Sequence, residues 1–215
     1  MDIKGYETTP TGLFPRYPRD SVCPALTSLY GSQSNTGVGG GRFGDAVIAP
    51  ADGEIIAVWE TDRGLGHEWN LLIAHTSKDV NSSDRASSYL SEFGPFEPKD
   101  VQQFRKGVRV KRGQEIGTVR HPGGTEDYPA GVRWAVYEIP VTSGKDLSWT
   151  KNEHGADIWS SNEARLIDPL YMLSRNQRKS SAGPVDLVPY TPGNDYSGFA
   201  GFTYIFECKG PPSNK

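Results

Sequence analysis

The segment GVRVKRGQEIG at residues 107–117 contains a turn, a short strand, a Lys-Arg-Gly turn and a second strand in one short run. Its counterpart is GDAVIAPADGEIIAV at residues 44–58, where one strand turns at Ala51-Asp52-Gly53 and returns as an alternating strand. Valine and isoleucine favour strands, and glycine favours turns. The two segments together predict a β-framework that carries other elements on its edges.

The composition also favours strands over helices. The chain of 215 residues contains 25 Gly and 16 Pro, and both residue types interrupt helices and mark turns. Its length and its hydrophobic content of 35% are enough for one sizeable core. We therefore predict an all-β protein that consists of one domain with appendages.

The charge and hydropathy patterns exclude two classes of partner. The net charge is -3 and the isoelectric point is about 5.8, whereas nucleic-acid binders need clustered cations. The densest cationic run, from Arg105 to Arg112, is interpreted as a solvated turn edge. No window approaches the roughly 20 apolar residues of a transmembrane helix, and no apolar signal core follows the N-terminus. We predict no nucleic-acid partner and no membrane span.

The two cysteines, Cys23 and Cys208, lie near opposite ends of the chain. They are too far apart for a metal-binding pair and too few for a disulfide scaffold. One disulfide between the N-terminal arm and the C-terminal strand is one interpretation, and two unpaired thiols are the other. The sequence leaves both open.

Hydrophobic periodicity and turn residues divide the chain into three parts. Residues 1–34 are rich in proline and predict an extended N-terminal arm without a helix. Residues 35–173 form the main domain, with insertions near 92–106 and 143–163, and residues 174–215 form a linker and a C-terminal strand packed on the domain. Within the domain, strands are predicted at about 45–49, 54–60, 69–75, 87–91, 108–110, 115–119 and 132–140.

The order of these segments resembles that of the lysostaphin-like zinc endopeptidases of bacterial cell walls. Residues 44–58 resemble the family's G-x-x-V-x-A-P-x-D-G-x-V strand pair, and residues 107–117 resemble its G-x-x-V-x-x-G-Q-x-I-G segment. Four shorter matches are Asn70 to His75 with N-x-V-x-I-x-H, Ser88-Tyr89 with the start of Y-x-H-L, Trp134 to Ile139 with H-L-H-F-E-V, and Ile167-Asp168-Pro169 with I-D-P. The resemblance covers residues 35–173 and implies a β-sandwich or barrel-like domain of the duplicated hybrid motif type.

The residues that the resemblance assigns to the zinc site are of the wrong types. The family holds zinc with a His and an Asp from an H-x-G-x-D loop and with the last His of its H-x-H strand. Here Asn35 and Gly39 take the two loop positions, Trp134 and Val136 take the two strand positions, and Ser91 stands where another family His belongs. A shift of register recovers no ligand, because residues 122–153 contain no histidine. We therefore predict no catalytic residues, no metal and no cofactor.

The resemblance then favours a catalytically inactive peptidase-like module. Such a module binds cell-wall peptidoglycan or a protein partner, regulates a hydrolase, or serves in an envelope or phage-tail assembly, and it is extracellular or periplasmic once any export signal is removed. Two alternatives are an active hydrolase whose zinc site is relocated to His67, His121 or His154, and a purely structural subunit with an apolar patch around the C-terminal aromatic residues. The candidate groove residues are Asn35, Gly39, Ser91, Trp134, Val136, Tyr137, Trp149 and Trp159. The opposing interpretation is that Trp134 and Val136 simply fill the space of the lost zinc.

Overall fold

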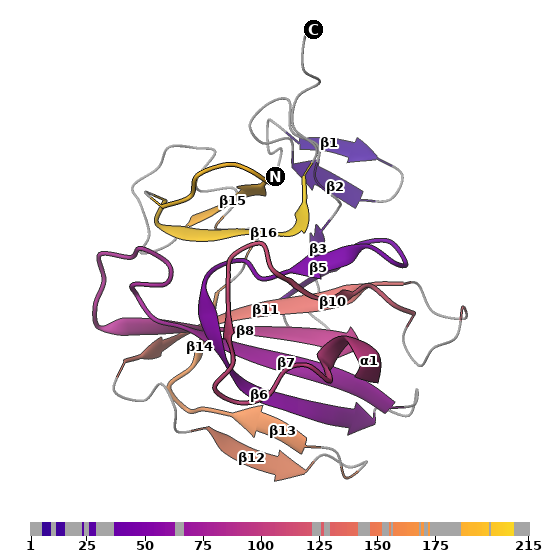
Figure 1. Cartoon of the computed structure of the whole chain (residues 1–215), viewed down its shortest axis with the longest axis vertical. Coiled ribbons are helices and arrows are strands. Elements are labelled where there is room, and N and C mark those ends of the chain that lie inside the picture. Colours follow the sequence, from indigo (N-terminus) through magenta and orange to yellow (C-terminus); the bar gives the residue numbers. More distant parts are fainter. Residues whose placement is uncertain are drawn as a thin grey trace, which may run out of the picture.

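The structure is a computed structural model, and it confirms an all-β protein (Figure 1). The one helix whose bounds the structure describes is α1 (Pro98–Val101), a single turn, and Pro169 and Met172 are also helical. No helix of the described part is long and apolar enough to cross a membrane. The structure describes residues 6–9, 12–15, 23, 26–28, 37–62, 67–121, 126, 130–141, 147–151, 155, 157–167, 169, 172, 186–197 and 199–208.

One large antiparallel sheet forms the centre of the molecule. Its strand order is β3-β4-β11-β8-β7-β6-β9. Strands β4 and β14 pair with the same edge of β11, β4 near the start of that strand and β14 further along it. The predicted strands at 54–60, 69–75, 87–91, 108–110 and 132–140 all lie in this sheet. The strands are β3 (Leu26–Ser28), β4 (Val38–Gly40), β6 (Gly53–Asp62), β7 (His67–His75), β8 (Ser87–Phe96), β9 (Arg109–Val110), β11 (Val132–Pro140) and β14 (Arg165–Ile167).

The central strands are buried on both faces, which explains why their sequences are apolar without long polar interruptions. Alternation along β11 sends Trp134 and Val136 into the larger hydrophobic cluster on one face, and Tyr137 and Ile139 toward a smaller cluster on the other. The two faces of this strand therefore pack against different clusters. Strand β7 divides in the same way, with Ile73 in the larger cluster and Leu72 in the smaller one.

Two small sheets cover the face that carries the larger cluster (Figure 1). Strands β5 (Ala46–Ile48) and β10 (Glu115–Thr118) pair with each other, and both were predicted from the sequence. Strands β15 (Asp186–Tyr190) and β16 (Gly201–Glu207) form a parallel pair. All residues of β16 except Glu207 are buried, and Phe202, Tyr204, Ile205 and Phe206 belong to the larger cluster. The C-terminal strand thus covers the sheet, as predicted, but it hydrogen-bonds to β15 and not to a sheet edge.

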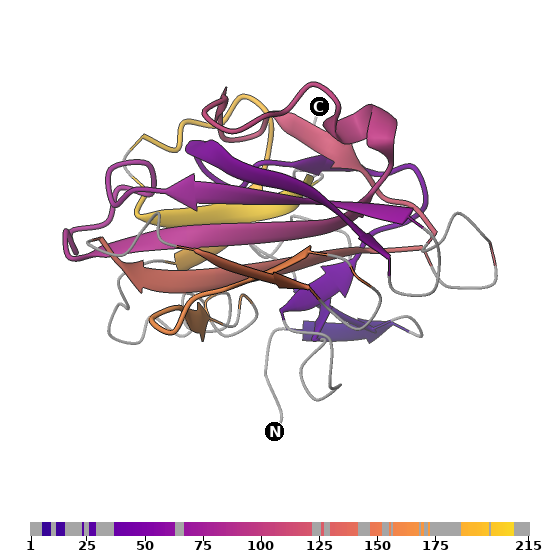
Figure 2. The same ribbon diagram turned by 90° about the horizontal axis from the view of Figure 1, so that it is seen from below.

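A hairpin covers the opposite face. Strands β12 (Ser148–Lys151) and β13 (Asp157–Ser160) form this hairpin inside the predicted insertion at 143–163. Trp159 of β13 packs into the smaller cluster together with Trp59 and Leu72. In Figure 2 the hairpin lies in front of the main sheet and the β15–β16 pair lies behind it. The main sheet is therefore the middle of three layers.

The N-terminal arm is tied to the domain in two ways. Within it, β1 (Tyr6–Thr9) and β2 (Gly12–Pro15) form a hairpin, and β3 extends the main sheet by pairing with β4. Cys23 and Cys208 form a disulfide, which decides between the two interpretations of these residues. Because Cys208 directly follows β16, the bridge joins the arm to the strand that covers the core.

Three segments differ from the sequence-based expectation. Strand β8 continues to Phe96, so the excursion predicted at 92–106 begins only where α1 and the following turns lie. Strand β15 occupies part of the predicted linker at 174–195, and its apolar Leu187 is buried. The described residues of the arm form three short strands, which were not foreseen. The further assignment to the duplicated hybrid motif type stays a prediction.

Candidate functional site

The predicted groove residues on the central strands are enclosed in the core. Ser91, Trp134 and Val136 are each 0% exposed. Gly39 lies on β4 opposite Arg133, and it is also buried. None of these four residues offers a surface to a ligand. The geometry agrees with the alternative interpretation, in which Trp134 and Val136 fill the interior.

The aromatic ring of Phe202 lies over this part of the sheet. Its centroid is 6.3 Å from that of Trp134, 5.9 Å from that of Tyr89 and 5.2 Å from that of His75, all in edge-to-face arrangements. Edge-to-face pairs are favourable because the positive edge of one ring meets the negative face of another. A single side chain of β16 thus closes the region where the family resemblance puts the zinc site.

His75 is held beneath Phe202 as a neutral imidazole. Its Nδ1 lies 2.6 Å from the carbonyl oxygen of Asp52, which only accepts hydrogen bonds, so Nδ1 carries the proton. Its Nε2 then accepts the hydrogen bond from the Ser91 hydroxyl at 3.0 Å. Burial lowers the pKa of His75 to about 4. His75 and Ser91 therefore join the β5–β6 turn to the sheet and are not placed to act on a substrate.

The remaining aromatic candidates lie on the opposite face of the sheet. The Tyr137 and Trp159 rings are 4.9 Å apart, and Trp149 packs edge-on against Trp59 at 5.4 Å. Trp149 is 41% exposed, whereas Trp159 is nearly buried. The structure therefore does not bring these three residues together with Trp134. Asn35 lies outside the described residues.

The described residues also provide no alternative metal centre. No three His, Cys, Asp or Glu side chains among them lie close enough together to hold a metal ion. His67 forms an exposed pair with Glu60 at 2.8 Å, and His121 stacks on the exposed ring of Phe43. His154 lies outside the described part of the chain. The observed side chains therefore do not fit a zinc ion.

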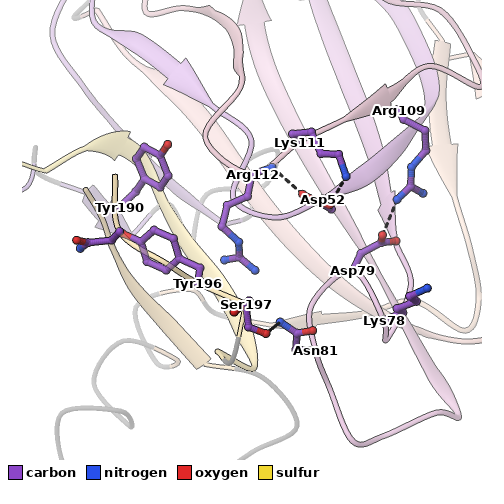
Figure 3. A pocket seen from close by; sticks show the side chains of 11 residues that line it. Asp52, Lys78, Asp79, Asn81, Arg109, Lys111, Arg112, Tyr190, Tyr196 and Ser197 are labelled. Carbon is purple, nitrogen blue, oxygen red and sulfur yellow. Dashed lines mark hydrogen bonds and ion pairs between the residues drawn. The ribbon is translucent and has the colours of Figure 1, made fainter. Parts of the chain in front are cut away.

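A polar pocket of about 580 Å³ opens beside the C-terminal segment (Figure 3). Its walls come from three framework turns, which follow β5, β7 and β9, and from the segment that joins β15 to β16. The framework turns contribute charged side chains, and the C-terminal segment contributes tyrosine, asparagine and serine. The lining residues are Asp52, Lys78, Asp79, Asn81, Arg109, Lys111, Arg112, Tyr190, Asn194, Tyr196 and Ser197.

Asp52 connects the two framework segments that define the fold. Its carboxylate accepts a hydrogen bond from Lys111 Nζ at 2.7 Å and one from the Arg112 backbone N–H at 3.0 Å. Partial burial by itself raises the pKa of Asp52, but these hydrogen bonds and the nearby positive charges outweigh burial and lower it. Asp52 is therefore ionised at neutral pH and neutralises Lys111.

A second ion pair borders the same pocket. Arg109 Nη2 lies 2.5 Å from Asp79 Oδ1, and the other oxygen of Asp79 accepts hydrogen bonds from the backbone and hydroxyl of Thr76. Burial raises the pKa of Asp79, but these hydrogen bonds outweigh it and lower the pKa. Lys78 is exposed and forms no ion pair with any described residue. Two of the four cations that line the pocket, Arg109 and Lys111, are therefore each paired with a carboxylate.

Arg112 lies between the framework and the C-terminal segment. Its guanidinium donates to the carbonyl oxygens of Pro50 and Gly201, each at 3.0 Å. It also lies over the rings of Tyr196 and Phe199, at 5.7 and 5.9 Å from their centroids. Burial lowers the pKa of Arg112, but a guanidinium stays charged at neutral pH. Its side chain is half-buried and forms no ion pair with a described carboxylate, although the nearby charge of Asp52 acts to raise its pKa.

The turn that carries Arg112 requires a glycine. Gly113 has a φ of +78°, and a Cβ atom there would lie 2.0 Å from the hydroxyl oxygen of Tyr190. The Tyr190 ring stacks on Tyr196 with centroids 5.6 Å apart. Tyr196 is fixed in turn by its hydroxyl, which accepts the Thr191 N–H at 2.7 Å. The aromatic wall is thus packed directly against the framework turn.

Sequence reasoning missed this pocket although it singled out both framework turns. The cationic run was interpreted as a solvated turn edge. That interpretation is wrong for Arg112, which is half-buried and lies over two aromatic rings. Tyr190 belonged to the linker predicted at 174–195, and Tyr196 directly follows that range. The available signal was the pairing of an Asp-Gly turn with a Lys-Arg-Gly turn, which places opposite charges on adjacent loops.

Comparisons of the chain with family models, with curated proteins and with solved structures gave no significant match. The function of the chain is therefore inferred from its own residues and their geometry.

Proposed function

We propose that the chain is a catalytically inactive peptidase-like module that binds cell-wall peptidoglycan. The observation that carries the proposal is the state of the positions which the resemblance assigns to the catalytic centre. Gly39 has no side chain, Val136 has no ligating atom, and the indole of Trp134 can only donate a hydrogen bond. These positions lie in the core, with Phe202 packed on Trp134.

A zinc-dependent hydrolase needs three protein side chains as zinc ligands and a fourth, open coordination position for water. The enclosed positions supply neither ligands nor an opening, so the retained framework favours binding over catalysis. The polar pocket beside β15 and β16 supports a binding role because it is concave and combines charged, amide and aromatic groups. The disulfide is compatible with an extracellular or periplasmic protein, which is where peptidoglycan is found.

The proposal is tested with the purified full-length chain in three measurements. Metal analysis is expected to find no stoichiometric zinc, and incubation with peptidoglycan is expected to release no soluble fragments. Sedimentation with insoluble peptidoglycan is expected to carry the chain into the pellet. Stoichiometric zinc together with cleavage would show an active hydrolase with a relocated site. A chain that stays in the supernatant, without cleavage, would favour a protein partner or a structural subunit.

The structural alternative predicted an apolar surface around the C-terminal aromatic residues. Phe202, Tyr204 and Phe206 are instead buried, so that patch is not present on β16. Among the described residues, the large exposed hydrophobic side chains are Phe43, Val141, Trp149 and Ile158. No observation on the described residues therefore favours the structural alternative over binding.

A further inference from the structure

The pocket described above carries more positive than negative charge. Four cationic side chains and two carboxylates line it, on a chain whose net charge is -3. The Lys111–Asp52 and Arg109–Asp79 pairs neutralise each other. Lys78 and Arg112 form no ion pair with any described residue, and the carboxylate whose charge acts on Arg112, Asp52, already pairs with Lys111. The excess positive charge is therefore local to the pocket and comes from Lys78 and Arg112.

Arg112 is the more informative of the two. Its hydrogen bonds go to the neutral carbonyl oxygens of Pro50 and Gly201, which orient the guanidinium but do not neutralise it. Partly enclosing a charge costs free energy when its counter-charge is shared, as Asp52 is shared with Lys111, and a bound anion would offset that cost. Figure 3 shows Arg112 between the tyrosine wall and the charged framework turns. This position favours an anionic group in the centre of the pocket.

The opposite wall has a different character. The stacked rings of Tyr190 and Tyr196 give it apolar surface, and the Asn194 and Ser197 side chains add hydrogen-bonding groups. A sugar ring has an apolar C–H face and a rim of hydroxyl groups, and this combination matches an aromatic wall edged by amides and hydroxyls. An inorganic anion would use only the cationic side of the pocket.

The two walls are fixed to each other before any ligand binds. Asn81 donates to the carbonyl oxygens of Ser197 and Phe199 at 2.9 and 3.1 Å. The Gly201 N–H donates to the Val80 carbonyl at 2.8 Å. A preformed site loses little conformational entropy on binding. Its volume of about 580 Å³ is ample for one or two sugar rings.

We propose that this pocket binds an acidic carbohydrate, a sugar ring that carries a carboxylate or a phosphate, with the anion at Arg112 and Lys78 and the ring against Tyr190 and Tyr196. The inference rests on the proposed function only in treating the chain as a binding module. It assigns a ligand class and a place for it, neither of which follows from the zinc positions.

The test is a titration of the isotope-labelled full-length chain followed by backbone NMR shifts, with glucuronate, neutral glucose and inorganic phosphate as separate probes. Glucuronate is expected to bind with a Kd on the order of 1 mM, typical of a small ligand of this size. Its shifts are expected to cluster at residues 78–81, 109–113 and 190–197. Glucose is expected to bind at least about tenfold more weakly because it lacks the charge.

Two variants separate the two halves of the ligand. Lys78→Gln is expected to weaken glucuronate roughly fivefold, the upper range for an exposed charge pair, and the matched control Lys106→Gln, outside the pocket, to change nothing. Asn194→Ala is expected to weaken glucuronate but not inorganic phosphate. Neither Lys78 nor Asn194 uses its side chain in the described core, so both variants should fold.

Each other outcome overturns the inference. Equal binding of glucose and glucuronate would show that the pocket does not recognise the carboxylate. Equal binding of phosphate and glucuronate, without an effect of Asn194→Ala, would show that it does not recognise the sugar ring. If no probe changes the backbone NMR shifts, the pocket is not a binding site for these ligands. Zinc content and peptidoglycan cleavage, which test the proposed function, do not enter this titration. Peptidoglycan sedimentation without glucuronate binding would therefore leave the proposed function intact and reject this pocket.

Discussion

The C-terminal segment closes one region of the molecule and opens another. Over the centre of the sheet, β16 inserts Phe202 between Trp134 and His75, and the result is a dry, filled interior. A few residues away, the segment between β15 and β16 forms one wall of the polar pocket. Both regions combine the same framework with the same C-terminal segment, so the character of each is decided by the side chains that meet there.

The largest effect is expected where the interior is filled. Phe202→Ala removes a buried ring that touches three other rings, and it should lower the free energy of unfolding by about 3–5 kcal/mol. Urea denaturation measures this change. Phe43→Ala is the control, because Phe43 is 70% exposed and its loss should stay within about 0.5 kcal/mol. Similar losses for the two variants would mean that β16 does not close the sheet.

The disulfide should come next, because it anchors the end of the covering strand. A Cys23→Ser and Cys208→Ser double variant should lose about 2–4 kcal/mol, since the bridge joins residues separated by 185 positions and restricts the unfolded chain. Reducing the unaltered protein under the same denaturation conditions should give the same loss. A loss below about 1 kcal/mol in both experiments would contradict a role in holding β16.

The pH dependence of stability tests the burial of His75. Its folded pKa of about 4 lies below the ordinary value of 6.5, so the unfolded chain binds more protons between these values. Stability should be complete above about pH 6.5 and fall by up to about 3 kcal/mol as the pH decreases to about 4. Denaturation at several pH values measures the slope, and His75→Asn should flatten it. The lowered pKa values of Asp52 and Asp79 add their loss only near pH 4 and below.

The smallest effects are expected in the pocket. Arg112→Lys should cost about 1–2 kcal/mol, because a lysine cannot keep both hydrogen bonds to the Pro50 and Gly201 carbonyls. Lys78→Gln should change stability by no more than about 0.5 kcal/mol. Thermal denaturation of both variants measures the difference. A large loss for Lys78→Gln would indicate that the pocket is part of the folded core and not an open site.

Much of the framework could be predicted because its signals are local. Alternation in residues 132–140 and the Gly-containing turns at 51–53 and 111–113 correctly placed strands β5, β6, β9, β10 and β11. Strand β15 and the β12–β13 hairpin were missed because their residues alternate too weakly and their stability comes from packing. Leu187 and Trp159 are buried only because distant strands cover them.

The candidate site shows the same division. The sequence identified Trp134, Val136 and Ser91 as replacements at the positions of the resemblance, but it left open whether they lined a groove. It interpreted the cationic turn as solvated, since nothing near residue 112 indicates that Tyr196 and Phe199 approach it. A local pattern cannot report a contact between residues so far apart in the chain.

By itself, the sequence determined that the protein is built from strands, and it predicted a resemblance to zinc peptidases in which the positions assigned to the zinc ligands hold residues of other types. These properties depend on residue type and on short-range periodicity, which can be read along the chain. Only the tertiary structure decided that Phe202 packs on Trp134, one of the positions that the resemblance assigns to the zinc site, and that Asp52, Asp79, Arg112 and Tyr196 surround one pocket. Such contacts arise from long-range strand pairing and burial. They bring together segments whose local sequences do not indicate that they will meet.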